Sequence, residues 1–274
     1  MEIFNNPQTI KIQGNSMTYF REGKGETILF VHGITTYSFI WRKVVPFFQG
    51  SYDIILIDLL GCGNSDKPLN EDFSLKRQAH LIKDFCQKLA ITKLHLVCHD
   101  VGGGIGQIIA VNYPGLLYDL TLINSVAYNF WPVQPIIAMR TPIIRQIAMA
   151  SLDFGMFEVI VKRGLYHKTL LTDELMEFFW KPMKESNGRK GFLHFAKCLD
   201  NKNLTELEDE IRHLQLPILI IRGEADVYLS GAISEKLHTE ISGSRLVKIK
   251  TGGHFIQEEE PEELSKSILN FINR

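Results

Sequence analysis

The sequence predicts an α/β fold: a mostly parallel, twisted sheet flanked by helices, with a helical insertion after the sixth strand. Three observations predict it. Continuous apolar runs typical of buried parallel strands alternate with segments of helical periodicity. One such strand, at 94–97, leads through a turn of small residues directly into a helix pattern. The alternation stops over 127–213 and then resumes, so right-handed crossovers would place all the strands in one sheet.

The composition is that of an ordinary globular protein. The chain has 274 residues, 45% of them hydrophobic and 22% charged, with a formal net charge of -1. This length suits one large α/β domain with an insertion, and the near-neutral charge gives no support for nucleic-acid binding. No basic leader, no apolar run of about 18 residues and no Cys-x-x-Cys pair is visible. We expect a cytoplasmic monomer or homodimer without a membrane or nucleic-acid partner.

The expected elements follow in order. Alternating segments joined at Gly14-Asn15 predict a hairpin of residues 10–13 and 17–22. Continuous apolar runs then predict buried strands at 27–31, 53–58, 94–97, 120–123, 216–221 and 246–249. Apolar spacing predicts helices near 41–48, over 74–89, after residue 100 and over 262–273.

The insertion at 127–213 has a different character. It contains Trp131, Trp180, several Met and Phe residues and no convincing buried strand, and Pro132, Pro135 and Pro142 break its start into short pieces. We interpret it as a mostly helical cap over an apolar site, with the core formed by 1–126 and 214–274. The alternative is a helical subdomain that does not contact substrate.

The stretch around Asp100 carries the main chemical signal. A buried strand, a sharp turn and a helix are the context of a nucleophile elbow, in which small residues stand two positions before and after the nucleophile. Here Cys98 and Gly102 take those positions, and Asp100 lies between them. A carboxylate is ionised near neutral pH and can attack saturated carbon directly, whereas acyl transfer to it would give an anhydride. The alternative is that Asp100 only caps the helix.

Further polar residues follow other strands of the predicted sheet. His32 follows the strand at 27–31, Asp226 comes shortly after the strand at 216–221, and His254 comes after the last strand. Ligands in open α/β sheets bind outside the carboxyl ends of the strands. The chain order of nucleophile, acid and histidine is the order of a hydrolase triad. Each residue alone would more often be structural.

Together these motifs resemble the α/β-hydrolase superfamily over essentially the whole chain. The matching segments are His32-Gly33, Asp58 with 61–68, the elbow, 223–226 and 253–262. The His-Asp elbow resembles the branch with an aspartate nucleophile, which holds the epoxide hydrolases and the haloalkane and haloacetate dehalogenases. The tail at 254–262 is similar to that of the dehalogenases in particular.

The resemblance implies a role for each matching residue. Asp100 would attack carbon and form an alkyl ester, and His254, oriented by Asp226, would activate the water that hydrolyses this ester. The backbone N–H groups of Ile34 and Val101 would form the oxyanion hole. Loss of His254 is therefore expected to trap the ester.

Departures from the family patterns bear on the leaving group. Haloalkane dehalogenases usually bind the halide with side-chain N–H donors at the positions that Ile34 and Val101 occupy here, and neither has such a donor. Trp131 or Trp180 could supply one indole. Epoxide hydrolases need acids that protonate the ring oxygen, usually Tyr from the cap, and Tyr128 and Tyr166 are candidates. These comparisons favour an epoxide over a halide.

Two more residues are candidates for substrate contact, and no cofactor or metal is expected. Asn124 stands where some members of the branch place the triad acid, and His32 follows a strand at the ligand-binding edge. The glycines at 102–106 do not match the dinucleotide spacing. We expect a cofactor-independent hydrolase acting on a small apolar organic electrophile. The alternative is a non-hydrolytic or ligand-binding member, with Asp100 as a base or structural anchor.

Overall fold

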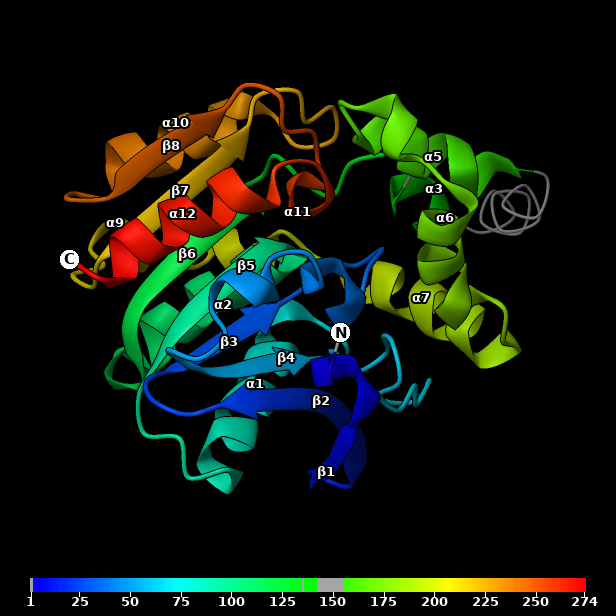
Figure 1. Cartoon of the computed structure of the whole chain (residues 1–274), viewed down its shortest axis with the longest axis horizontal. Helices are drawn as coiled ribbons and strands as arrows, with labels where there is room; N and C mark the ends of the chain where they lie inside the picture. The colour runs from blue at the N-terminus through cyan, green and yellow to red at the C-terminus, as the bar shows by residue number, and fades with distance from the viewer. Residues whose placement is uncertain (1, 135, 142–154) are drawn as a thin grey trace.

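The structure, a computed structural model, describes residues 2–134, 136–141 and 155–274 (Figure 1). These residues form one eight-stranded sheet with the order β1-β2-β4-β3-β5-β6-β7-β8. Within it, β2 pairs antiparallel with β1 and β4, and the other neighbouring pairs are parallel. The strands are β1 (Gln8–Ile12), β2 (Asn15–Gly23), β3 (Thr27–Val31), β4 (Asp53–Ile57), β5 (Leu94–Asp100), β6 (Leu117–Ser125), β7 (Ile218–Gly223) and β8 (Arg245–Ile249). The predicted mostly parallel sheet is confirmed.

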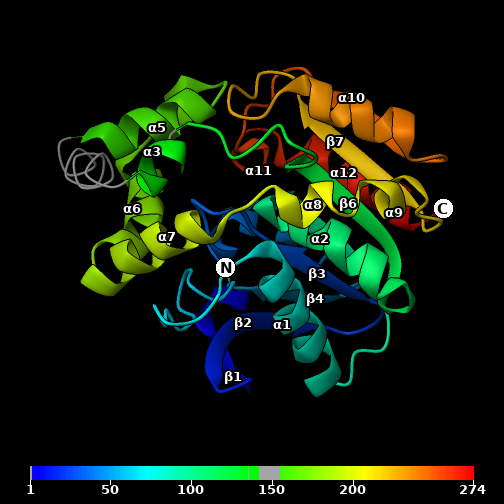
Figure 2. The same cartoon turned by 180° about the vertical axis from the view of Figure 1, so that it is seen from behind.

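Helices cover both faces of the sheet (Figures 1 and 2). One face carries α1 (Leu75–Lys88), α2 (Val101–Asn112) and α10 (Gly231–Glu240). The other carries α12 (Pro261–Ile272), which contacts β7 and β8. The short helix α11 (Ile256–Glu259) precedes α12 and begins two residues after His254.

The segment after β6 is helical where the structure describes it, in agreement with the sequence. Beyond the carboxyl edge of the sheet lie α3 (Ile136–Arg140), α5 (Phe157–Gly164), η6 (Lys168–Leu170), α6 (Asp173–Trp180), η7 (Lys181–Met183) and α7 (Ser186–Cys198) (Figure 1). The chain then forms α8 (Lys202–Thr205) and α9 (Glu208–Arg212), which pack against α2. The end of the predicted cap thus lies against the core. Pro135 and Pro142 lie outside the described residues.

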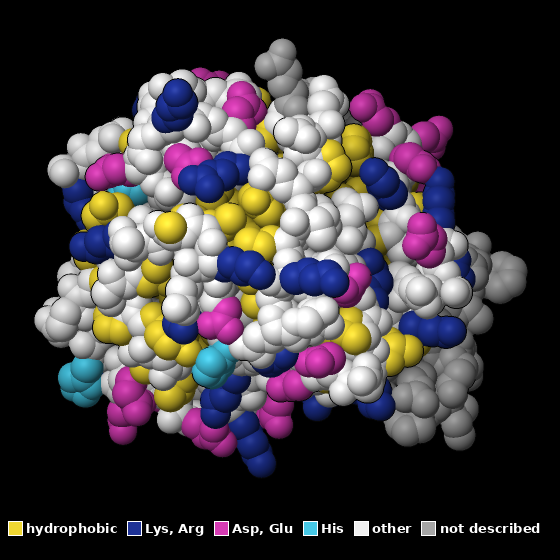
Figure 3. All heavy atoms as spheres, turned by 90° about the horizontal axis from the view of Figure 1, so that it is seen from below, with side chains coloured by type: hydrophobic (Ala, Val, Ile, Leu, Met, Phe, Trp, Pro, Cys, Tyr) yellow, Lys and Arg dark blue, Asp and Glu magenta, His cyan; other side chains and the backbone are white. Residues whose placement is uncertain are grey.

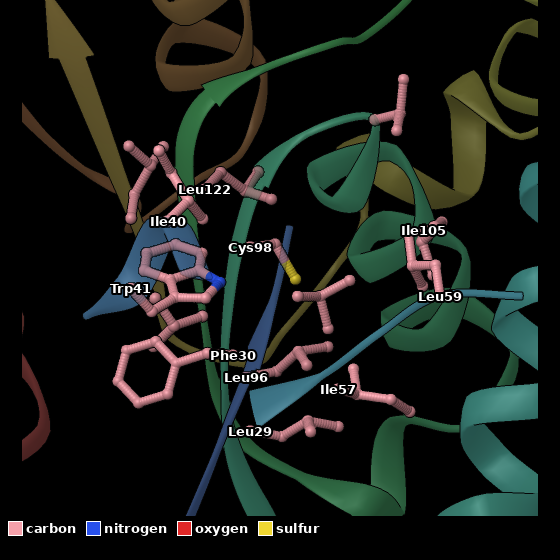
Figure 4. Close-up of a cluster of buried hydrophobic side chains, with 14 of the residues drawn as sticks. Leu29, Phe30, Ile40, Trp41, Ile57, Leu59, Leu96, Cys98, Ile105 and Leu122 are labelled. Carbon is pink, nitrogen blue, oxygen red and sulfur yellow. The ribbon is translucent and has the colours of Figure 1, made fainter. Parts of the chain in front are cut away.

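The core lies on the central strands, and Figure 4 shows part of it around β3 and β5. Labelled there are Leu29, Phe30, Ile40, Trp41, Ile57, Leu59, Leu96, Cys98, Ile105 and Leu122, all buried. The rings of Phe30 and Trp41 are 5.1 Å apart between centroids. Burying one such side chain contributes about 1.5–3 kcal/mol. Because both faces of the sheet are covered, these strands are continuous apolar runs in the sequence.

Two details concern the predicted helices. The first long helix begins at Leu75 because the Ser74 hydroxyl accepts a hydrogen bond from the N–H of Arg77 at 3.3 Å, which caps its N-terminus. The single helix expected near 41–48 is instead two 3-10 turns, η2 (Ser38–Trp41) and η3 (Val45–Phe47). Pro46, inside η3, lacks the N–H that a continuous helix would require.

The outer surface has mixed charge on the face seen in Figure 3, where Lys and Arg side chains are interspersed with Asp and Glu. Among the described helices, none combines the length and apolar character needed to cross a bilayer.

Candidate active site

Asp100 occupies the turn between β5 and α2 in an unusual backbone conformation. Its φ is 54° and its ψ is -122°, a combination that costs a non-glycine residue about 1–3 kcal/mol. The turn is tight: a Cβ added at Gly102 would lie 2.6 Å from the carbonyl oxygen of His32. Glycine is therefore required two positions after Asp100, as the elbow pattern predicts.

Backbone N–H groups from two elements hold the Asp100 carboxylate. Its Oδ2 accepts a hydrogen bond from the N–H of Ile34 at 3.1 Å. The N–H of Val101 is a second hydrogen-bond donor to the carboxylate. Apart from this interaction with Val101, the side chain of Asp100 makes no capping hydrogen bond to α2, so a simple cap does not describe this residue. Burial raises the pKa of Asp100, while nearby His254 and the two N–H groups oppose the rise.

His254 and Asp226 form a hydrogen-bonded pair. His254 Nδ1 lies 3.0 Å from Asp226 Oδ2, and the Nη1 atom of Arg222 lies 3.3 Å from the same oxygen. Burial raises the pKa of Asp226, but His254 and Arg222 outweigh this and hold it below its ordinary value. Burial lowers the pKa of His254, but Asp226 and then Asp100 raise it above its ordinary value. Both directions favour an orienting carboxylate and a basic imidazole.

Asn124 joins the loops that carry this pair. Its Nδ2 donates to the carbonyl oxygens of Gly253 at 2.9 Å and His254 at 3.2 Å, and its Oδ1 accepts from the N–H of Gly223 at 2.9 Å. These bonds use its whole amide, and it does not line the cavity beside Asp100. The geometry therefore does not support the predicted substrate contact, and indicates that Asn124 positions the Asp226 and His254 loops.

His99 also contacts this backbone. Its Nε2 lies 2.9 Å from the carbonyl oxygen of His254, and the two rings are 4.9 Å apart. Burial and the nearby His254 lower the pKa of His99 to about 3, so the ring is neutral and can donate through only one nitrogen. His99 thus has a structural role, because its hydrogen bond fixes the backbone of His254.

A small apolar cavity lies above Asp100. Its volume is about 50 Å³, and both Asp100 and His254 line it. The other lining residues are Ile34, Thr35, Val133, Gln134, Ile136, Ile160, Tyr228, Leu229 and Phe255. Four of these (Val133, Gln134, Ile136 and Ile160) come from the segment 127–213, so this segment contributes part of the cavity wall.

The aromatic candidates from the cap lie elsewhere. Tyr128 is buried, with the Lys236 ammonium 3.7 Å from its ring centroid, and Trp131 is 2% exposed. Tyr166 is 48% exposed, and Trp180 packs against Phe157 with centroids 4.9 Å apart. None of the four lines the cavity. Their predicted substrate contacts are therefore not supported, because an apolar pattern does not reveal which way an aromatic side chain points.

His32 is likewise a structural residue. Its Nδ1 lies 2.7 Å from the carbonyl oxygen of Gly33, and its Nε2 accepts from the N–H of Leu59 at 3.0 Å. The ring is fully buried, burial lowers its pKa, and it does not line the cavity. His32 therefore shapes the turn that presents the N–H of Ile34 to Asp100, and the predicted substrate contact is not supported.

Sequence reasoning missed Tyr228 and Phe255. Tyr228 lines the cavity, its ring is 5.3 Å from that of His254, and its hydroxyl donates to the carbonyl oxygen of Ile160 at 2.6 Å. Phe255 follows His254 directly and lines the same cavity. Their places next to Asp226 and His254 in the sequence were the available signal, since loops at this edge surround the ligand.

These groups can perform substitution followed by hydrolysis. A carboxylate held by two N–H groups, an imidazole with an acidic partner and an apolar wall are the elements of covalent catalysis. Within the described ranges, no group of three or more His, Cys, Asp or Glu side chains could hold a metal ion.

Comparison with known families identifies the fold. The family model described as alpha/beta hydrolase fold matches residues 26–261, which is most of the chain and includes Asp100, Asp226 and His254. The chain belongs to the α/β-hydrolase fold family. The fold expected from the sequence is thereby confirmed.

Three curated relatives of the chain cover most of its length. YugF, an uncharacterized hydrolase of Bacillus subtilis, is 27% identical and covers 90% of each sequence. A cis-3-alkyl-4-alkyloxetan-2-one decarboxylase of Shewanella oneidensis is 25% identical, covering 94% of this chain and 86% of that protein. Epoxide hydrolase 2 of Caenorhabditis elegans is 24% identical, covering 98% and 80%.

Solved structures share the fold. An α/β hydrolase fold protein from Burkholderia ambifaria has a TM-score of 0.88 at 22% identity, covering 96% of this chain and 97% of that one. The haloalkane dehalogenase DbeA from Bradyrhizobium elkani has a TM-score of 0.86 at 22% identity, covering 98% and 97%. At these identities the similarity shows the fold alone.

Proposed function

We propose that this protein is a cofactor-independent hydrolase that acts on a small apolar electrophile through a covalent ester on Asp100. The observation that carries the proposal is that Asp100 and His254 line one apolar cavity while His254 is hydrogen-bonded to Asp226. A serine nucleophile would need its proton removed, whereas a carboxylate attacks at once. The histidine is then available for a later step.

In the first step, a carboxylate oxygen of Asp100 attacks a saturated carbon and the leaving group departs with the bonding electron pair. The cavity wall is largely apolar, which weakens solvation of the carboxylate. The N–H groups of Ile34 and Val101 keep the carboxylate oriented. The product of this step is an alkyl ester on Asp100.

In the second step, His254 removes a proton from water, and the resulting hydroxide attacks the carbonyl carbon of the ester. The N–H groups of Ile34 and Val101 stabilise the oxyanion that forms, an interaction whose loss typically costs about 3–4 kcal/mol. Collapse of this intermediate expels the alkoxide, which takes the proton back from His254 and leaves as the alcohol. Asp100 is left as a carboxylic acid, and release of its proton to solvent restores the carboxylate.

An epoxide is the first candidate substrate, and the nematode relative named epoxide hydrolase supports it. Ring opening produces an alkoxide, which requires an acid. Tyr228 is the one tyrosine that lines the cavity within the described part of the chain, and its hydroxyl donates to Ile160. To protonate the alkoxide, the Tyr228 hydroxyl would have to turn away from the carbonyl oxygen of Ile160 and donate to the substrate oxygen.

A second candidate is an electrophile whose leaving group needs no proton. The Tyr228 hydroxyl already donates its proton to the carbonyl oxygen of Ile160, which favours an electrophile of this kind. A halide and the carboxylate released from a four-membered lactone both leave as stable anions. The neighbouring dehalogenase structure and the Shewanella relative named for oxetan-2-ones make these two classes worth testing.

Trapping the ester tests the proposal and identifies the substrate class. The His254→Gln variant is incubated with 1,2-epoxybutane, 1-bromobutane or β-butyrolactone, and its intact mass and peptide map are recorded. We expect a stable adduct on Asp100 with one of these classes, because the first step does not need His254. The Asp100→Asn, His254→Gln double variant is the matched control and should remain unlabelled.

Two results would contradict the proposal. Absence of an adduct with all three probes would favour a ligand-binding protein in which Asp100 is a base or a structural anchor. Hydrolysis of any of the probes that survives Asp100→Ala would exclude Asp100 as the nucleophile.

A further inference from the structure

The carboxylate of Glu259 lies between the histidine loop and the cap. Glu259 is the last residue of α11, which follows the loop carrying His254. Its Oε2 accepts a hydrogen bond from the N–H of Gly253 at 2.6 Å. Its Oε1 accepts from the N–H groups of Tyr166 at 2.5 Å and His167 at 2.7 Å, in the segment between α5 and η6. One side chain thus binds the backbone next to the catalytic histidine and the backbone of the cap.

A direct backbone contact reinforces this connection. The N–H of His254 itself donates to the carbonyl oxygen of Gly164, at the end of α5, over 2.7 Å. The packing is close, since a Cβ added at Gly253 would lie 2.4 Å from the same carbonyl oxygen and 2.8 Å from Oε2 of Glu259. The position of His254 is therefore fixed relative to residues 164–167 of the cap.

The side chain at position 259 must be a hydrogen-bond acceptor. A carboxylate accepts hydrogen bonds only, so the three N–H groups match it without conflict. Glu259 is 9% exposed, and burial raises its pKa while the three N–H groups oppose that rise. Glutamine has nearly the same shape, but its NH₂ group would face an N–H donor and lose at least one of these bonds.

We propose that Glu259 is a positioning residue that holds His254 in reach of the Asp100 ester only while cap residues 164–167 are seated against the histidine loop. This inference rests on the proposed function. Glu259 itself lies outside the residues that line the cavity, so it acts through the backbone of Gly253 and His254.

The proposal makes the two chemical steps respond differently. Formation of the ester requires Asp100 and the substrate, whereas its hydrolysis requires a correctly placed His254. Displacing a catalytic group by about 1 Å can cost about 100-fold in rate. Loss of the Glu259 contacts should therefore slow hydrolysis of the ester much more than its formation. A purely structural role would affect both steps together or neither.

The first test compares Glu259→Gln with Glu259→Asp and wild type. Single-turnover reactions with the probe that labels His254→Gln are quenched in acid, and the fraction of esterified protein is measured by intact mass. We expect Glu259→Gln to hydrolyse the ester about tenfold or more slowly, with formation within about twofold of wild type. Glu259→Asp keeps the charge and should lie between the two. The exposed Glu262→Gln variant is the matched control and should behave as wild type.

A second readout does not depend on any substrate. The ring of His254 is titrated by NMR with labelled histidine, and its signal is assigned from its absence in His254→Gln. Asp226, Asp100, Arg222 and His99 surround this ring, and none of them is changed. If the loop loosens, the contact with Asp226 weakens, and we expect the pKa of His254 to fall by about one pH unit in Glu259→Gln.

These readouts separate the inference from the proposed function. If no probe labels His254→Gln, the proposed function fails and the titration alone decides about Glu259. Equal slowing of both steps, or wild-type hydrolysis together with a wild-type titration, would overturn the role of Glu259. Should Glu259→Gln not fold, Gly253→Ala, which places a methyl group in the same contact, is measured in the same two ways.

Discussion

The imidazole Nδ1 of His254 lies 3.0 Å from Oδ2 of Asp226, at the edge of the sheet where the two loops meet. Because Asp226 is ionised and accepts this hydrogen bond, the proton of the neutral ring resides on Nδ1. Nε2 is then the unprotonated nitrogen, the one that a base needs. The roles proposed for the two residues determine how the enzyme should respond to substitution and to pH.

Changing Asp226 to Asn should impair the second step selectively. An amide at this position can donate to Nδ1 and thereby favours the wrong tautomer of His254. The corresponding change in a serine-based triad costs about 10⁴ in kcat. We expect ester hydrolysis to slow by about 100- to 10,000-fold, with little change in ester formation. Burst kinetics with acid-quenched intact mass measure both rates, and equal rates in the variant and wild type would contradict the role of Asp226.

The pH dependence should differ between the two steps. His254 must be neutral to accept a proton, and its pKa is raised above its ordinary value by Asp226 and Asp100, against the effect of burial. Ester hydrolysis should therefore rise with pH through this pKa, above about 6.5. Formation needs ionised Asp100. Burial raises the pKa of Asp100, whereas the charge of protonated His254 lowers it, so we expect formation to persist on the acid side of the His254 pKa.

It follows that wild-type enzyme should accumulate the ester on the acid side of the His254 pKa. Single-turnover reactions between about pH 5 and 9 reveal this as a growing esterified fraction towards low pH. Hydrolysis that is independent of pH across this range would show that His254 is not the base.

Substitutions of Asn124 should separate the contributions of hydrogen bonding and of backbone strain to the free energy of unfolding. Asn124→Ala removes the bonds to Gly223, Gly253 and His254, and we expect a loss of about 1–3 kcal/mol in the free energy of unfolding. The φ of Asn124 is 39°, which disfavours alanine by about a further 1 kcal/mol. Asn124→Gly avoids this strain and should be the more stable of the two in urea unfolding. Equal stability of both variants would mean that strain at this position is negligible.

A methyl group at Gly33 should block the nucleophile. A Cβ built there would lie 2.6 Å from Oδ2 of Asp100, so the carboxylate would have to move. We expect Gly33→Ala in the His254→Gln background to form the ester about 100-fold more slowly. Gly115→Ala is the control, since nothing lies within 4 Å of its added Cβ. Normal labelling of Gly33→Ala would show that Asp100 tolerates displacement.

The sequence predicts the sheet well because its signal is local. Continuous apolar runs such as 27–31 and 53–58 correspond to β3 and β4, and the turn after β5 places Asp100 where the elbow pattern expects it. The approach of Asp226 and His254 follows from the common edge of parallel strands. These features depend on the periodicity of apolar residues and on the order of the elements along the chain, and a sequence displays both directly.

The orientation of side chains in the cap depends on long-range packing. Residue type and position predict Tyr128 and Tyr166 as candidate acids, yet Tyr228 lines the cavity instead. The amide of Asn124 spans loops 99 and 129 residues away in the sequence, and no local pattern encodes such a contact. Pro46 could have signalled the break between η2 and η3, because proline rarely continues a helix.

The volume above Asp100 also bears on how substrates are sorted by size. The cavity of about 50 Å³ is walled on the side of residues 127–213 by Val133, Ile136 and Ile160. The size and position of these three side chains limit how much of a carbon chain can lie beside Asp100. Selection among substrates of different chain length would then depend on how easily α3 and α5 move. Substitution of these apolar residues should broaden or narrow the accepted chain length without altering the reaction.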